Sequence, residues 1–258
     1  WLNNVTGNTA PPLQSLGALV WLTTPALSGF LLRAFGGDGW QDSGFGLNLP
    51  SGWKWYLVAL LVYPLASLLT FGLAALLGIL SADGFAAQGF DAYLSAVGMI
   101  FIGSLMKNFF EEFAWRSYLT PRLDAAKVHP MINHIIVGIL WWSWHLPYYY
   151  YYLDCATLES AITTSIPVFL GLAFIVQIPT AILFGELRLL SKSTWTVFLL
   201  HMVINALSMP LLINGFIEIK GPLAPVFTSS YEGLIVSLLF GVTGWILMKY
   251  RLKNIGHA

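Results

Sequence analysis

Three ionisable side chains stand within one of the most apolar stretches of the chain. The stretch NFFEEFAWRSYL, residues 108–119, contains Glu111, Glu112 and Arg116. A charge near the centre of a membrane-spanning helix costs about 2.5–3.5 kcal/mol on insertion scales, so such groups usually face the interior of a helix bundle. Their presence here indicates either an internal structural contact or chemistry.

Helical spacing separates the two glutamates. Glu112 and Arg116 are four residues apart on one helical face, in the order that favours an ion pair. That pair could simply hold two helices together. Glu111 points about 100° away from Glu112, so Arg116 cannot easily serve both carboxylates. Structure alone therefore leaves Glu111 without an explanation, which makes it the candidate for chemistry.

Two later apolar segments carry further polar pairs. WWSWHLP places Trp141 and His145 on one helical face, and HMVIN does the same for His201 and Asn205. Each pair alone is weak evidence of chemistry, because hydrogen bonds between buried helices use the same side chains. Counting from the predicted cytoplasmic ends places Glu111, His145 and His201 roughly 13, 21 and 11 Å deep. One shared site therefore requires the fourth helix to be tilted or shifted by a turn.

Composition indicates a membrane protein. Of the 258 residues, 57% are hydrophobic and 9% are charged, and the mean hydropathy is +0.72. Soluble domains carry about 25% charged residues. The lone Cys155 excludes an intrachain disulfide, and a net charge of zero without a basic run gives no surface for nucleic acid. We predict an all-α, polytopic transmembrane helical bundle.

Apolar runs of about 20 residues predict seven spans, with eight possible, in a single domain over residues 1–258. The sites of interest fall in a core of about residues 92–213. Because the chain begins with Trp1 rather than Met, the native N-terminus could extend further. The predicted spans are 14–34, 55–80, 92–120, 131–152, 162–187, 194–213 and 231–250.

Cationic residues predict the orientation. The chain has 12 Lys and Arg residues, and two of them, Lys107 and Arg116, lie inside the third predicted span. Of the other ten, nine fall on one side of the bundle and Lys220 falls on the opposite side. The positive-inside rule then places the N-terminus outside and the C-terminus in the cytoplasm, in the cell membrane if the source is prokaryotic. The run Tyr148–Tyr152 is expected in an outer aromatic belt. The nine cations that share one side are Arg33, Lys54, Arg122, Lys127, Arg188, Lys192, Lys249, Arg251 and Lys253.

Other buried-looking polar residues receive structural interpretations. Glu186 and Arg188 stand at the end of the fifth predicted span and are expected at the membrane interface. Asn133 and His134 stand near the start of the fourth span and are expected to be structural.

The three motifs in this order resemble the CPBP (Abi) family, which contains type II CAAX prenyl proteases and bacteriocin-processing proteins. The resemblance runs from the third to the sixth predicted span. Tryptophan at position 141 stands where phenylalanine is also common, and it keeps an apolar ring. The motifs are Glu111-Glu112-x-x-x-Arg116, Trp141-x-x-x-His145 and His201-x-x-x-Asn205.

The resemblance implies an intramembrane peptidase acting on a membrane-associated peptide or protein, prenylated or not. Glu111 would be the catalytic carboxylate and His145 its partner in activating water. His201 and Asn205 would stabilise the oxyanion. The chemistry agrees, because peptide hydrolysis needs a base, a donor to the oxyanion and a proton for the leaving amine. Structural support would come from Glu112, Arg116 and Trp141.

A zinc site is the alternative use of the same residues. Glu111, His145 and His201 form a His₂Glu set, which is a known catalytic zinc ligand set. Asn205, one turn from His201, suits an oxyanion-binding pair better. No carboxylate is expected beside either histidine to orient it, because Glu112 is engaged by Arg116. We therefore predict no obligatory metal or other cofactor.

Two other functions use the same features. Buried carboxylates and histidines could relay protons or bind a cation in a transporter. Transporters favour interrupted helices at corresponding positions of two halves, and no internal repeat pairs the prolines in these spans. The chain could also be a non-catalytic immunity or scaffold protein on the same fold.

Overall fold

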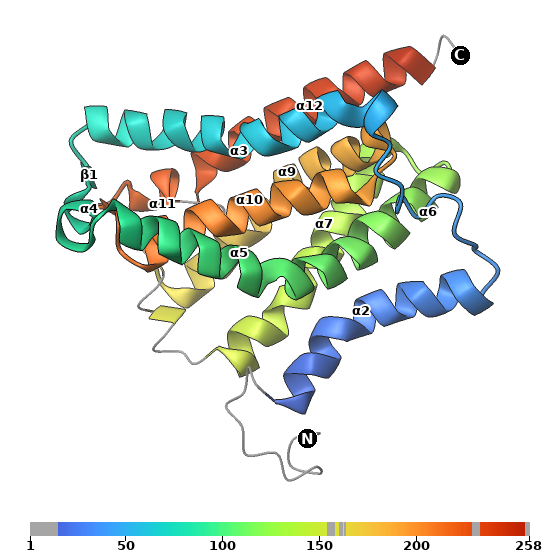
Figure 1. The fold of residues 1–258 in the computed structure, drawn as a ribbon, viewed down its shortest axis with the longest axis horizontal. Coiled ribbons are helices and arrows are strands. Elements are labelled where there is room, and N and C mark those ends of the chain that lie inside the picture. Colours follow the sequence, from blue (N-terminus) through green and yellow to red (C-terminus); the bar gives the residue numbers. More distant parts are fainter. Residues whose placement is uncertain (1–14, 154–157, 160–161, 163, 229–232, 256–258) are drawn as a thin grey trace.

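A bundle of long helices makes up most of the protein (Figure 1). The computed structural model describes residues 15–153, 158–159, 162, 164–228 and 233–255. The predicted all-α class is confirmed, since the described strands are two-residue segments. The long helices are α2 (Leu16–Phe35), α3 (Leu49–Leu76), α5 (Phe90–Glu112), α7 (Pro130–Pro147), α9 (Ile166–Ser191), α10 (Thr194–Ile213) and α12 (Leu234–Ile255).

Short elements complete the helices and connect them. Strand β1 pairs antiparallel with β2, with Leu80 opposite Ile219, and so joins the connection after α3 to the connection after α10. Two π-helical segments, η2 and η3, directly follow α5 and α7. The short elements are β1 (Leu80–Ser81), α4 (Asp83–Gln88), η2 (Phe113–Leu119), α6 (Thr120–Ala125), η3 (Tyr148–Tyr152), β2 (Glu218–Ile219) and α11 (Ala224–Phe227).

The chain is an integral membrane protein. Within the described part of the chain, six helices are long and apolar enough to cross a membrane. The fourth predicted span, 131–152, is α7 followed by η3 and is not among the six. Asn133, His134 and His145 lower its hydropathy. The six are Leu16–Phe35, Leu49–Leu76, Phe90–Ala125, Ile166–Ser191, Thr194–Ile213 and Leu234–Asn254.

Helix α7 and the segment η3 carry the chain from one end of the bundle to the other. The segment from α5 to α6 and helix α9 both end beside the same loop, because Arg122 contacts the Asp42 carboxylate and Arg188 donates to the Asp42 carbonyl. The chain must therefore return to the opposite end between them. The return is made by α7 and η3, which run alongside α9 (Figure 1). The number of seven spans stays a prediction.

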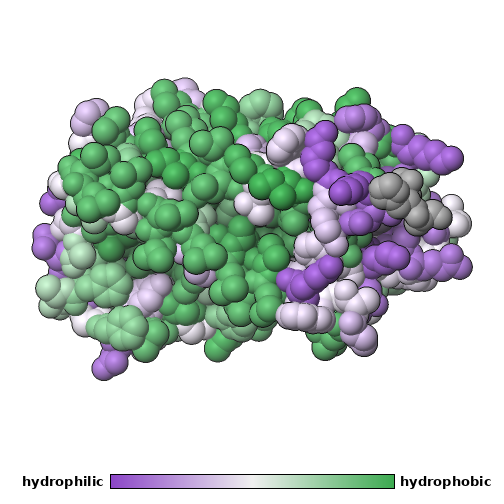
Figure 2. Space-filling view, turned by 90° about the horizontal axis from the view of Figure 1, so that it is seen from above, coloured by the Kyte–Doolittle hydropathy of each residue, from purple (hydrophilic) through white to green (hydrophobic). Residues whose placement is uncertain are grey.

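The surface divides into an apolar region and a charged end. Figure 2 shows hydrophobic residues over most of one face and hydrophilic residues gathered at the end where α6 and the end of α12 lie. At that end Arg33 lies 2.7 Å from the Asp42 carboxylate and Arg251 lies 3.4 Å from Asp124. Burial raises the pKa of Asp42, but hydrogen bonds from Arg33 and Arg122 outweigh it and hold that pKa below its usual value.

Small residues let α9 approach its neighbours closely. A Cβ at Gly138 of α7 would lie 2.8 Å from the Ile178 side chain, and a Cβ at Gly244 of α12 would lie 2.8 Å from the backbone nitrogen of Leu183. Close approach at small residues is a main source of helix–helix packing in membranes. Helix α9 is thereby fixed between α7 and α12.

Glu186 and Arg188, which the sequence places at the membrane interface, are both buried within the protein. Glu186 Oε1 lies 2.7 Å from His134 Nε2, and Arg251 Nε donates to Glu186 Oε2 at 2.7 Å. The carboxylate therefore joins α7, α9 and α12, which fits the structural interpretation of His134. Cys155 lies outside the described residues.

Candidate active site

Helices α5, α7 and α10 bring the predicted residues to one place. Glu111 and Glu112 form the last two residues of α5, and Arg116 lies in the π-helical segment η2 that follows. All three side chains are buried. π-Helical turns inside helices occur frequently at functional sites.

Trp141 connects Glu111 to His145. Its indole Nε1 donates to Glu111 Oε2 at 2.8 Å, and its backbone carbonyl lies 2.8 Å from His145 Nδ1. A hydrogen on Nδ1 that points at this carbonyl leaves Nε2 free to accept a proton. His145 Nε2 lies 3.9 Å from Glu111 Oε2. The two side chains therefore meet, although counting residues from the predicted ends of the spans placed them at different depths in the membrane.

Lys107 is the ionic partner of Glu111. Its Nζ lies 2.7 Å from Glu111 Oε1. The sequence interpretation did not include this pair, which gives Glu111 a structural contact besides its proposed chemistry. The signal was present in the sequence, because Lys107 precedes Glu111 by four residues, the same spacing that indicated the pair of Glu112 and Arg116.

Glu112 holds two cationic or polar partners. Its Oε1 lies 3.3 Å from Arg116 NH1, which confirms that pair, and 2.7 Å from His201 Nδ1. The expectation that no carboxylate lies beside His201 is wrong. The Arg116 guanidinium also packs 3.7 Å from the centre of the Trp141 ring, a cation–π contact. Glu112 thereby fixes His201 and, through Arg116, supports Trp141.

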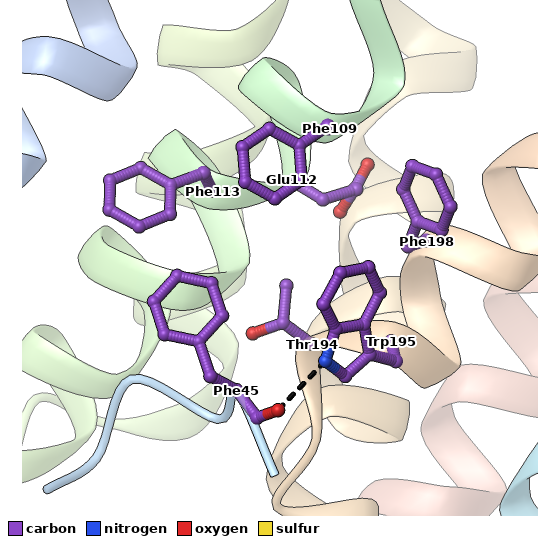
Figure 3. Close-up of a pocket in the computed structure, with 7 residues that line it drawn as sticks. All are labelled: Phe45, Phe109, Glu112, Phe113, Thr194, Trp195 and Phe198. Atoms are coloured by element: carbon purple, nitrogen blue, oxygen red, sulfur yellow. Dashed lines mark hydrogen bonds between the residues drawn. The ribbon is translucent and has the colours of Figure 1, made fainter. Parts of the chain in front are cut away.

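The surroundings of Glu112 differ from those of Glu111. Figure 3 shows Glu112 beside a small aromatic pocket that Trp195 helps to line, with the Trp195 indole donating to the Phe45 carbonyl at 2.8 Å. The pocket has a volume of about 10 Å³, enough for about one water molecule. It has no room for a peptide, so Glu112 is suited to a structural role.

Asn108 positions Asn205. Asn205 Nδ2 donates to Asn108 Oδ1 at 2.9 Å, and Asn108 Nδ2 contacts the Met202 sulfur at 3.1 Å. The sequence interpretation did not include Asn108. It stands four residues before Glu112, and this spacing was the available signal.

Two adjoining hollows give access to the site. A cavity of about 70 Å³ is bordered by His145, His201 and Asn205. A larger groove of about 780 Å³ shares Lys107, His145 and Asn205 with it and extends between α2, α5 and α10. The groove is otherwise mainly apolar, with lining residues that include Leu16, Leu19, Leu22, Met99, Ile100 and Met209.

Tyr149 also borders both hollows. The sequence placed it in an outer aromatic belt with its neighbours. Tyr150 and Tyr151 are exposed, as such a belt requires, but Tyr149 is buried and packs against Phe169 with ring centres 5.2 Å apart. The difference follows from helical geometry, because consecutive side chains of a helical segment point in different directions.

The donors do not form a closed metal shell. Across the described ranges, no group of three His, Cys, Asp or Glu side chains converges closely enough to hold a metal ion. His201 directs Nδ1 at Glu112. The absence of an obligatory metal stays a prediction.

Comparison with known proteins gives one family. No curated protein matches the chain. A family model described as type II CAAX prenyl endopeptidase Rce1-like matches residues 93–207. This range holds all three motifs, from Glu111 to Asn205, and the resemblance indicated by those motifs is confirmed. Over residues 93–207 the chain is therefore similar to type II CAAX prenyl endopeptidases of the Rce1-like kind.

Proposed function

We propose that the protein is an intramembrane endopeptidase that hydrolyses a peptide bond of a membrane-associated protein or peptide. One observation carries the proposal. Glu111 is buried and lies 3.9 Å from the Nε2 atom of His145, and His145 borders a small cavity together with His201 and Asn205. A base, a proton carrier and two donors therefore meet where a peptide bond could enter.

The reaction follows from the donors and acceptors. A water molecule beside Glu111 and His145 Nε2 would lose a proton to this pair and attack the carbonyl carbon. The oxyanion would accept hydrogen bonds from Asn205 Nδ2, which has a second hydrogen besides the one given to Asn108. His201 would donate from Nε2 when both ring nitrogens carry hydrogen. The proton taken from water would pass to the leaving amine as the carbon–nitrogen bond breaks.

Substrate and orientation belong to the same proposal. The apolar groove suits a substrate embedded in the bilayer, prenylated or not. The cations at one end of the bundle favour a cytoplasmic C-terminus and an N-terminus outside, in the cell membrane if the source is prokaryotic.

The test compares the C-termini of membrane peptides in cells that contain the wild-type protein or Glu111→Gln. We expect new C-termini with the wild type and none with the variant, while both proteins reach similar folded levels in the membrane. Identical sets of termini would contradict the proposal. A proton or cation flux in proteoliposomes that Glu111→Gln abolishes, without any cleaved product, would support a transporter instead.

Metal dependence has its own test. We expect purified, active protein to work in a strong chelator, because water is activated by Glu111 and His145. Loss of activity in the chelator that stoichiometric zinc restores would make Glu111, His145 and His201 metal ligands.

A further inference from the structure

Lys107 stands between the buried carboxylate and the entry groove. Its ammonium lies 2.7 Å from Glu111 Oε1, and its side chain is 40% exposed while that of Glu111 is fully buried. It borders both the small cavity and the large groove. The lysine thus contacts the candidate base on one side and faces incoming substrate on the other.

The charge of Lys107 lies in mainly apolar surroundings. Among the described residues that line the groove and the cavity, Lys107 is the one Lys or Arg, and there is no Asp or Glu. A charge in mainly apolar surroundings attracts an opposite charge more strongly than it would in water. Lysine also has a flexible four-carbon stem and three donors, so it can change partners without leaving its place.

We propose that Lys107 selects substrates that carry a carboxylate near the scissile bond, by exchanging its ion pair with Glu111 for one with the substrate. This inference rests on the proposed peptidase function. The exchange has a consequence for the reaction, because Glu111 is released from its counter-ion when such a substrate is bound. Water activation is then coupled to substrate entry.

The carboxylate could have two sources. It could be the free C-terminus of a peptide cut near its end, or an Asp or Glu side chain close to the cleavage site. Both present the same oxygen atoms to an ammonium group.

The experiment uses a peptide identified from the comparison of C-termini above. It is prepared as the free acid, as the C-terminal amide, and as the amide with glutamate at the last position. The ratio of kcat/KM between these forms is measured in proteoliposomes for each protein. Because a ratio within one protein is independent of its folded fraction, partial misfolding of a variant does not affect the result.

For the wild type we expect the acid to be cleaved about ten- to a hundredfold better than the amide, the effect of one hydrogen bond to a charged group. Lys107→Gln should bring this ratio near one, and Lys107→Arg should keep most of it. Lys249→Gln is the matched control, since it removes the same charge from an exposed position on α12 and should leave the ratio unchanged. If the wild type cleaves the glutamate-bearing amide as well as it cleaves the free acid, any carboxylate near the scissile bond is sufficient. If the wild type cleaves it only as well as the plain amide, the C-terminal carboxylate is the one required.

Equal cleavage of acid and amide by the wild type would overturn the inference, as would a ratio that survives in Lys107→Gln. Either result leaves the proposed peptidase intact. Failure of the wild type to cleave all three forms would instead contradict the proposed function.

Discussion

At the scale of single residues, Trp141 contacts three other members of the site. Its indole N–H holds Glu111, its carbonyl holds His145, and its ring carries Arg116. The motif indicated only an apolar ring at this position. Phenylalanine could keep the ring contact and the backbone contact, but it has no N–H. The tryptophan is therefore a specific feature of this site.

Trp141→Phe is expected to lower kcat/KM about ten- to a hundredfold, because Glu111 loses one hydrogen bond to a charged group. The folded amount should stay close to that of the wild type. Trp142→Phe is the control, since its indole donates to the Leu170 carbonyl at 3.2 Å and has no contact with Glu111. Steady-state kinetics on a cleaved peptide gives the comparison, and full activity of Trp141→Phe would contradict this role.

Glu112→Ala is expected to lower the stability of the folded protein. Arg116 and His201 would lose their shared carboxylate, and breaking a buried pair on one side costs about 3–5 kcal/mol. Thermal unfolding in detergent measures the loss. Glu218→Ala, whose pair with Lys220 is exposed at both ends, should change the midpoint little. An unchanged midpoint for Glu112→Ala would show that the pair is not structural.

The sequence could predict contacts within helices better than contacts between them. Spacing of four residues correctly paired Glu112 with Arg116, and the same rule applied to Lys107 would have paired it with Glu111. The contact of Glu112 with His201 joins α5 to α10 and depends on how these helices pack. Helical periodicity contains no information on that packing. The burial of Glu186 was missed for the same reason, since Arg251 reaches it from α12.

At the scale of helices, α12 supports the family segment from outside it. The family match ends at residue 207, whereas α12 begins at Leu234. Gly244 lies against the backbone of Leu183, and Arg251 binds Glu186. Both contacts reach α9, which packs on α7 and so supports the helix that carries His145.

Gly244→Ala is expected to destabilise the protein by about 1–3 kcal/mol, the usual cost of overpacking. The new Cβ would lie 2.8 Å from a backbone atom, which cannot move as a side chain does. Gly171→Ala in α9 is the matched control, because nothing lies within 4 Å of its new Cβ. Thermal unfolding should rank Gly171→Ala at or above the wild type and Gly244→Ala below it. Equal midpoints for the two variants would contradict the close approach.

The existence of the helices could be predicted better than their ends. All seven predicted apolar runs contain a long helix, but α3 begins at Leu49 rather than near residue 55, and α9 continues to Ser191. At these ends Asn48, which precedes α3, donates from its side-chain amide to the backbone carbonyl of Ser191, the last residue of α9. A prediction from hydropathy ends each helix before its polar terminal residues.

At the scale of the whole molecule, the two ends of the bundle differ in charge. Arg33, Arg122 and Arg188 converge on one loop at the charged end. Lys220 lies at the other end, where β2 pairs with β1 beside α4. The division of cations predicted from the sequence is therefore also a division in space.

A reporter fused after Ala258 is expected to be cytoplasmic, and one inserted between Asp83 and Gln88 is expected to be external. The expectation follows from the positive-inside rule applied to the two ends. Fusions to a reporter active on only one side of the membrane give the measurement. A cytoplasmic signal from the 83–88 position would overturn the arrangement of seven spans.

The groove has a consequence for kinetics. Its edges include Leu19 in the first turn of α2 and Met99 near the middle of α5, whose side chains are 53% and 68% exposed and so face lipid. A substrate that enters between these edges arrives by lateral diffusion in two dimensions. Its effective concentration is then its mole fraction in the bilayer rather than its amount per volume of buffer. At a fixed total concentration, adding inert lipid should slow turnover by surface dilution, while adding buffer should not.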